Sequence, residues 1–198
     1  MKKVFFTIVL SFLFVSAMQA QGDFKVGVTG GLINSNTNIN ISALGFSLVD
    51  IDAINSTGFY VGGIADVGLS DKFHAQAELT YGSAGNLGFV YLPVLAKYYV
   101  ASGFNLQAGP QFSFSTTLDA IKDGIEDIED VIGTNGNIDD VVSSTGVDFA
   151  LGAGFDITEN LSVQGRYAFE LTNRYNGPLN NTLTVRASTF NIGVAYFF

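Results

Sequence analysis

The chain has 198 residues, of which 47% are hydrophobic and only 14% are charged, a balance that excludes an intrinsically disordered protein. Eighteen acidic residues outnumber nine basic ones, and the resulting net charge of −9 argues against binding to nucleic acid. Because the chain contains no cysteine, it has no disulfide, no thiolate metal site and no cysteine nucleophile.

The N-terminus has the pattern of a secretory signal peptide. Two lysines open the chain, an apolar run extends from Val4 to Val15, and small or polar residues lead to Ala20. A membrane anchor is the alternative, but the apolar run is shorter than the roughly 20 residues that a spanning helix needs. The sequence therefore predicts a signal peptide over residues 1–20 and a mature domain over residues 21–198.

The mature chain repeats a period-two alternation of apolar with other residues, which is typical of β-strands. Each alternating segment has about the length that a tilted strand needs to cross a bilayer. The predicted strands are 24–32, 59–69, 73–81, 89–100, 104–114, 147–155, 161–171 and 190–198. Three of the links between them are short turns, and the longer loops are Ile33–Gly58, Gly82–Gly88, Ser115–Gly146 and Thr172–Thr189.

The two faces of the predicted strands differ in their chemistry. One face holds all the charged strand residues, which are Lys25, Asp66, Glu78, Lys97, Asp148, Asp156, Arg166 and Glu170. The other face is uncharged, and aromatic residues lie near the strand ends as in interfacial girdles. A soluble barrel or a β-sandwich is the alternative, but closure in lipid explains an uncharged outer face. The sequence therefore predicts an all-β fold: an eight-stranded antiparallel up-and-down transmembrane β-barrel with long extracellular loops.

The acidic loop at residues 115–146 is the most unusual of these connections. Its apolar residues recur at spacings of three and four, at Leu118, Ile121, Ile125 and Ile128. This spacing predicts a short amphipathic helix, which we interpret as a lid, a plug, a partner-binding helix or a helix packed on the barrel mouth. Calcium binding is disfavoured because the acids lack the alternating ligand spacing of a calcium loop.

The first long loop is also unusual. Asparagines alternate at Asn34, Asn36, Asn38 and Asn40, and a run of apolar residues follows them. Such apolar surface outside a bilayer should be covered, so we expect this loop to cap the barrel or to dock a partner.

Four charged residues of the inward face are expected at one level of the barrel. They are Asp66, Glu78, Lys97 and Arg166, two acids and two bases. We predict that they pair mutually and plug the lumen, since a buried charge needs a partner. Independent solvation of each charge in a wet channel is the alternative.

The single histidine, His74, follows a short turn and lies far from the long loops. We interpret it as a lumen histidine that hydrogen-bonds to Gln or Glu neighbours, and not as a catalytic group. The sequence therefore gives no catalytic residue, no metal site and no cofactor, and we expect no enzyme activity.

The last strand alternates up to a terminal phenylalanine, through Phe190, Ile192, Val194, Tyr196 and Phe198. It looks like the C-terminal signal strand that outer-membrane insertion machinery reads. The stretch Leu92-Pro93-Val94-Leu95, together with Ala108-Gly109-Pro110, resembles the PorT-like outer-membrane β-barrel group, often described as porin-family proteins. The resemblance covers residues 24–198 and implies a barrel in the bacterial outer membrane, but no substrate.

Three functions fit these expectations. The first is a structural or surface-interaction protein whose loops meet an extracellular partner, because an eight-stranded barrel is just wide enough for side chains to fill. The second is a narrow channel, which the many lumen glycines suggest. The third, an accessory role in secretion or assembly, rests on the resemblance. The expected partners are outer-membrane lipid, the insertion machinery and a surface protein, with no nucleic acid.

Overall fold

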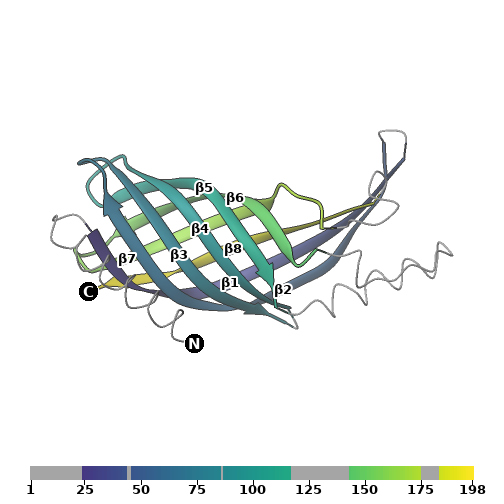
Figure 1. Ribbon diagram of the computed structural model, residues 1–198, viewed down its shortest axis with the longest axis horizontal. Helices are drawn as coiled ribbons and strands as arrows, with labels where there is room; N and C mark the ends of the chain where they lie inside the picture. The colour runs from purple at the N-terminus through teal and green to yellow at the C-terminus, as the bar shows by residue number, and fades with distance from the viewer. Residues whose placement is uncertain (1–23, 44–45, 86, 117–142, 175–182) are drawn as a thin grey trace, which may run out of the picture.

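The computed structural model describes residues 24–43, 46–85, 87–116, 143–174 and 183–198, which form a closed antiparallel β-barrel (Figure 1). Its strands are β1 (Phe24–Ala43), β2 (Phe46–Gly68), β3 (Phe73–Ala84), β4 (Leu87–Tyr99), β5 (Phe104–Ser115), β6 (Thr145–Asp156), β7 (Leu161–Glu170) and β8 (Leu183–Phe197). Each strand pairs with the next one along the chain, and β8 pairs with β1 to close the barrel. The predicted eight-stranded up-and-down barrel is confirmed.

Two of the predictions fall outside the described residues. These are the signal peptide at residues 1–20 and the amphipathic helix of the acidic loop. Within the described part of the chain, no helix has the length and apolar character needed to cross a membrane.

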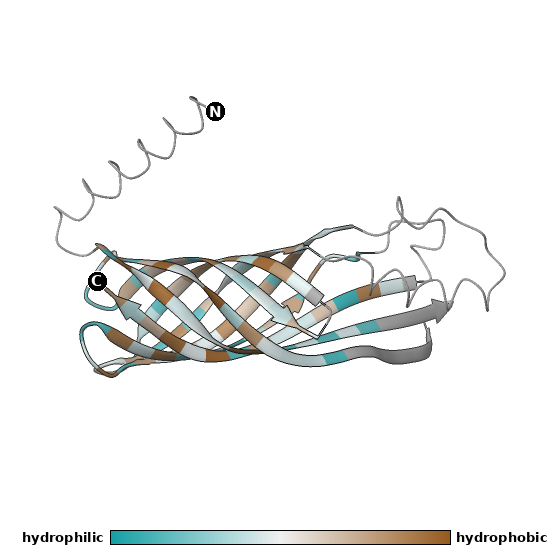
Figure 2. Cartoon of the chain, turned by 90° about the horizontal axis from the view of Figure 1, so that it is seen from below, coloured by the Kyte–Doolittle hydropathy of each residue, from teal (hydrophilic) through white to brown (hydrophobic). Residues whose placement is uncertain are grey.

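The barrel carries apolar side chains outside, and inside it carries polar side chains together with small apolar clusters around Ile64 and Leu95. Phe59, Leu79 and Val61 point outward and are 65%, 60% and 58% exposed. Hydrophilic and hydrophobic residues alternate along the strands in Figure 2. Successive strand residues point to opposite faces, so the period-two sequence places the charged strand residues inside and leaves the outer face apolar.

Short turns connect the strands at one end of the barrel, which we call the short-turn end. The turn between β4 and β5 closes with a hydrogen bond from Val100 N to Phe104 O at 3.0 Å. Gly103 in this turn has a φ of 77°, and a Cβ there would lie 3.0 Å from Asp156 O. Glycine is therefore the residue that this turn accommodates without strain. The opposite, long-loop end carries the other connections.

The structure corrects the predicted limits of three loops. The segment Ile33–Gly58 is not a loop, because β1 and β2 remain paired up to Ala43 and Phe46. The connection between β3 and β4 is likewise shorter than predicted, because β3 extends to Ala84 and β4 begins at Leu87. The strand β8 begins at Leu183, within the predicted loop Thr172–Thr189. The predicted limits followed the apolar residues, whereas backbone pairing continues through polar residues beyond the apolar face.

Candidate functional site

The interior of the barrel is the candidate site, because it contains buried charges. The buried charged residues in the described chain are Asp66, Glu78, Lys97, Asp148, Arg166, Glu170 and Arg174. Charged groups removed from water require ion pairs and hydrogen bonds. Their contacts form three sets, which follow one another from the short-turn end to the long-loop end.

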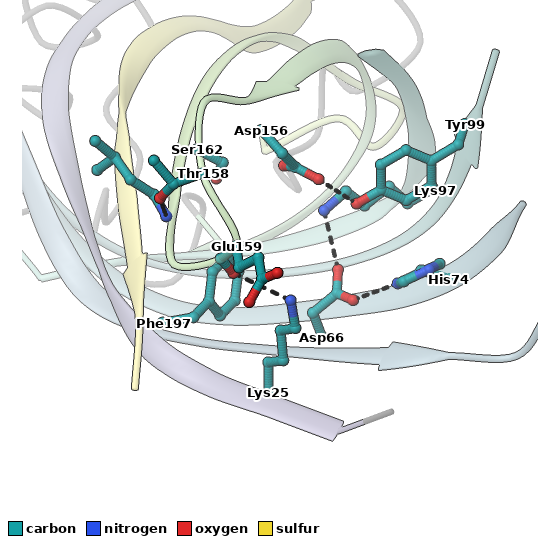
Figure 3. Close-up of a pocket in the computed structure, with 11 residues that line it drawn as sticks. Lys25, Asp66, His74, Lys97, Tyr99, Asp156, Thr158, Glu159, Ser162 and Phe197 are labelled. Carbon is teal, nitrogen blue, oxygen red and sulfur yellow. Dashed lines mark hydrogen bonds and ion pairs between the residues drawn. The ribbon is translucent and has the colours of Figure 1, made fainter. Parts of the chain in front are cut away.

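The mouth set lies at the short-turn end and comprises Asp66, His74, Lys97, Tyr99 and Asp156 (Figure 3). Lys97 Nζ donates to Asp66 Oδ2 at 3.1 Å, and His74 Nδ1 lies 2.6 Å from Asp66 Oδ1. The Tyr99 hydroxyl donates to Asp156 Oδ2 at 2.6 Å, and its ring centroid is 5.2 Å from Lys97 Nζ. These side chains line a cavity of about 170 Å³. One carboxylate, Asp66, thus joins a lysine to the histidine, in place of the Gln or Glu neighbours expected for His74.

The central set comprises Thr29, Gln76, Glu78, Gln164 and Arg166. Arg166 donates to both carboxylate oxygens of Glu78, at 2.6 Å from Nη2 and 3.3 Å from Nη1. Gln76 and Gln164 donate to the same carboxylate at 2.7 and 3.1 Å. Gln164 also reaches Thr29 Oγ1, at 3.3 Å. These residues come from β1, β3 and β7, so the set bridges the lumen between strands that are not all neighbours.

The loop-end set comprises Gln111, Ser113, Asp148, Glu170 and Arg174. Arg174 Nε lies 2.9 Å from Glu170 Oε1, and Arg174 Nη2 donates to Ser113 Oγ at 2.7 Å. Asp148 accepts hydrogen bonds from Gln111 Nε2 at 2.9 Å and from Ser113 Oγ at 3.3 Å. The serine therefore links the two carboxylates and the guanidinium into one network across β5, β6 and the end of β7.

The structure places the four residues of the predicted lumen cluster inside the barrel, but as two pairs. Lys97 contacts Asp66 in the mouth set, whereas Arg166 contacts Glu78 in the central set. The strand register explains the separation. Asp66 lies opposite Gln76, while Glu78 is two residues further along β3, at a deeper step of the barrel.

Arg174 is a lumen residue that the sequence did not indicate. It lies in a predicted loop, after the end of β7, yet only 2% of it is exposed. Its side chain turns back into the lumen, and its guanidinium carbon lies 5.3 Å from the ring centroid of Phe89. Its spacing of four residues from Glu170 was the one available signal.

The glycines of the lumen leave little open space. A Cβ on Gly154 would lie 2.9 Å from both Asn105 Oδ1 and Gln107 Nε2. A Cβ on Gly152 would lie 2.7 Å from Gly165 O and 3.2 Å from Arg166 Cγ. Neighbouring side chains and backbone thus occupy the volume beside these two glycines.

The residues predicted as an insertion signal lie on the outer side of β8 and at the chain end. They are Phe190, Ile192, Val194, Tyr196 and Phe198, each about half exposed or more. The end of the strand is held by Phe197 N, which donates to Asn160 O at 2.7 Å, and by Asn160 Nδ2, which donates to Phe197 O at 2.8 Å. Phe198 N donates to Val26 O at 2.9 Å, so the last residues help to close the barrel.

Within the described residues, no group of three or more His, Asp and Glu side chains is arranged to hold a metal ion. What the geometry provides is an outer face that is apolar over the middle of the strands, around a hydrogen-bonded interior that contains buried charges. These features define a transmembrane β-barrel protein.

The sequence matches the outer membrane protein beta-barrel domain over residues 5–198, so the chain belongs to this family. Family membership places the protein in the bacterial outer membrane, with its apolar face in the lipid bilayer. Comparison with curated proteins gives no match.

Several solved outer-membrane structures are similar at low identity. Ail, the attachment invasion locus protein of Yersinia pestis, is 12% identical with a TM-score of 0.47, and the match covers 89% of this chain and 99% of Ail. Neisserial surface protein A is 14% identical with a TM-score of 0.46, over 88% of this chain and 97% of that protein. OprG from Pseudomonas aeruginosa is 13% identical with a TM-score of 0.40, over 89% of this chain and 96% of OprG.

Proposed function

We propose that this protein is a self-plugged outer-membrane barrel, with a structural or surface-interaction role exerted through its extracellular loops. The observation that supports this proposal is the series of three hydrogen-bonded polar sets across the lumen. The Glu78–Arg166 pair at its centre is the strongest single part, since each partner is only 2–3% exposed and Glu78 accepts from three side chains.

Ion conduction through such a lumen would require these contacts to break. A buried carboxylate and guanidinium stabilise each other, and removing one partner of such a pair typically costs about 3–5 kcal/mol. The side chains inside the barrel therefore close the lumen and stabilise the fold. The extracellular loops are then the surface through which the protein interacts with its surroundings.

Planar-bilayer recording tests this proposal. We expect the purified barrel to give no stable conductance step, and the same result for D71A/K72A, which alters exposed charges in a turn outside the lumen. The variant E78A/R166A removes the central pair and is expected to admit ions. Reproducible conductance steps from the unmodified barrel would reject the self-plugged lumen.

A narrow channel is the second candidate function. The observation in its favour is the cavity of about 170 Å³ at the short-turn end, which accommodates several water molecules. The same recordings distinguish the two functions. An accessory role in secretion or assembly is supported only by the resemblance to PorT-like proteins, and isolation of the native complex would test it.

We further propose the path by which the chain reaches the membrane. Residues 1–20 act as a signal peptide that is removed, and residues 21–198 form the mature barrel. The insertion machinery recognises the last strand from Phe190 to Phe198. The partner at the cell surface is then a protein or another surface component that contacts the extracellular loops.

A further inference from the structure

A band of amide and hydroxyl side chains lies on the outer face of β8, β1 and β2, just beyond the apolar surface. The last fully apolar outward row pairs Leu32 with Phe59 and Ile192. The next outward rows are Thr57–Asn34–Phe190 and Asn55–Asn36–Ser188, followed by Asn38 opposite Arg186. The surface thus changes from hydrocarbon to amide within two rows.

The asparagines of this band face outward because the residues between them face inward. Ser35 and Thr37 are 1% and 3% exposed, which assigns their neighbours in β1 to the opposite face. Asn34 Nδ2 donates to Asn55 Oδ1 at 2.8 Å and to Thr57 Oγ1 at 3.0 Å. The amides are therefore ordered across two strands.

The position of the band in the membrane follows from the residues below it. Phe59 and Phe190 are exposed aromatic residues at the edge of the apolar face, as in the girdle that marks the bilayer interface. Outward rows are spaced by about 6.7 Å along a strand, so the amide rows extend over the several Å that the headgroups occupy. Long connections mark this end as extracellular. The band therefore faces the headgroups of the outer leaflet.

The chemistry of the band favours sugars over phosphates. Phosphate groups are typically bound by arginine and lysine, but Arg186 is the one cation among the described outward side chains of the band. The chain as a whole has a net charge of −9, which disfavours anionic ligands further. Side-chain amides both donate and accept hydrogen bonds, as sugar hydroxyls do. The Oδ1 atoms of Asn36 and Asn38 are buried, so these two residues are expected to donate to the sugar through Nδ2.

We propose that this amide band binds the sugar headgroups of glycolipids in the outer leaflet. The residues that make the contact are Asn34, Asn36, Asn38, Asn55, Thr57 and Ser188. This interaction surface anchors one side of the barrel in the headgroup layer, and it does not depend on whether the lumen conducts.

Native mass spectrometry of the folded, detergent-solubilised barrel tests the proposal, with diglucosyl-diacylglycerol and phosphatidylglycerol of the same acyl chains as probes. We expect the glycolipid to bind more tightly than phosphatidylglycerol. N36A/N38A should weaken glycolipid binding about tenfold, since two neutral hydrogen bonds are lost and 1.4 kcal/mol corresponds to a factor of about ten. The control D71A/S102A, in turns at the opposite end, should bind like the unmodified barrel.

Four outcomes would overturn the proposal. Equal binding of the two lipids would show that the barrel binds their acyl chains. Tighter binding of phosphatidylglycerol would show that it binds the phosphate group. Unchanged glycolipid binding by N36A/N38A would show that the sugars bind elsewhere. If the unmodified barrel is found as a dimer and N36A/N38A as a monomer, without a change in lipid binding, the band contacts a second copy instead. Retention of the heat-modifiable gel band confirms that each variant is folded.

Discussion

Glu78 accepts hydrogen bonds from three side chains, so its carboxylate depends on the residues around it. Arg166 supplies the compensating charge, and the two amides of Gln76 and Gln164 supply further donors. Replacing the arginine alone therefore leaves a buried anion with amide partners only. Replacing both members of the pair removes the charge as well as its partner.

We predict that R166A destabilises the barrel by about 3–5 kcal/mol and that E78A added to R166A recovers part of this loss. The free energy of unfolding in urea and detergent, followed for the two single variants and the double variant, gives the coupling energy. R186A is the matched control, because Arg186 is exposed and outside the lumen. Additive effects of the two changes would show that the pair does not interact energetically.

Arg174 connects the long-loop end to the lumen. Its backbone accepts from Ser143 N at 2.8 Å and donates to Val185 O at 3.1 Å, while its side chain contacts Glu170 and Ser113. We predict that R174A makes the Ser143 amide exchange hydrogen at least about tenfold faster, because a charged buried hydrogen bond contributes about 1.5–3 kcal/mol. Amide exchange in β3 should stay unchanged. Equal protection of Ser143 in R174A and in R186A would contradict this role.

For the four predicted lumen residues, the sequence predicted the face of the strand on which each charged side chain lies. It did not predict which residue each of them pairs with. Period-two alternation is a property of the strand itself, and it placed Asp66, Glu78, Lys97 and Arg166 on the inward face. The ion pairs depend on the stagger between strands, which period-two alternation does not encode. This stagger places two of the four residues in the mouth set and two in the central set. Arg174 was missed because it lies beyond the end of β7, where its spacing of four residues from Glu170 was the available signal.

At the scale of single elements, β8 closes the barrel and also carries the predicted insertion signal. Deleting Phe198 should lower the amount of folded protein in the outer membrane, because a terminal aromatic residue of the signal and the bond from its N–H to Val26 O are lost together. Comparing the unboiled and boiled gel bands in membrane fractions measures this amount. The control L69A keeps the terminus and removes an apolar side chain of similar exposure outside the signal, since Leu69 is 69% exposed and Phe198 is 76% exposed. Equal folded amounts for the deletion and for the unmodified protein would contradict the signal.

The strands were predictable where lipid contact imposes an apolar face, and not beyond it. Each predicted strand overlaps one observed strand, because every crossing needs alternating outward apolar residues. The β1–β2 hairpin extends past Asn34 and Thr57 with polar residues on its outer face, and an apolar criterion ends such a strand too early. Hydrogen bonding between backbones, rather than side-chain hydrophobicity, determines where this hairpin ends.

At the scale of the whole molecule, the barrel is closed and its interior is occupied by its own side chains. The absence of cysteine from the chain makes a direct measurement of this interior feasible. Thr29 lies in the central set, is 3% exposed and is close to cysteine in size, so T29C places one thiol in the lumen. S102C, in an exposed turn, is the matched accessible control.

The decisive measurement is the rate at which a small, charged thiol reagent modifies T29C in the folded barrel, reconstituted in vesicles and exposed to the reagent on both sides. A self-plugged lumen predicts that T29C stays unmodified while S102C reacts completely, and that T29C reacts only after boiling unfolds the barrel. Modification of folded T29C at the rate of S102C would show that water and ions reach the centre of the lumen, and would contradict the account.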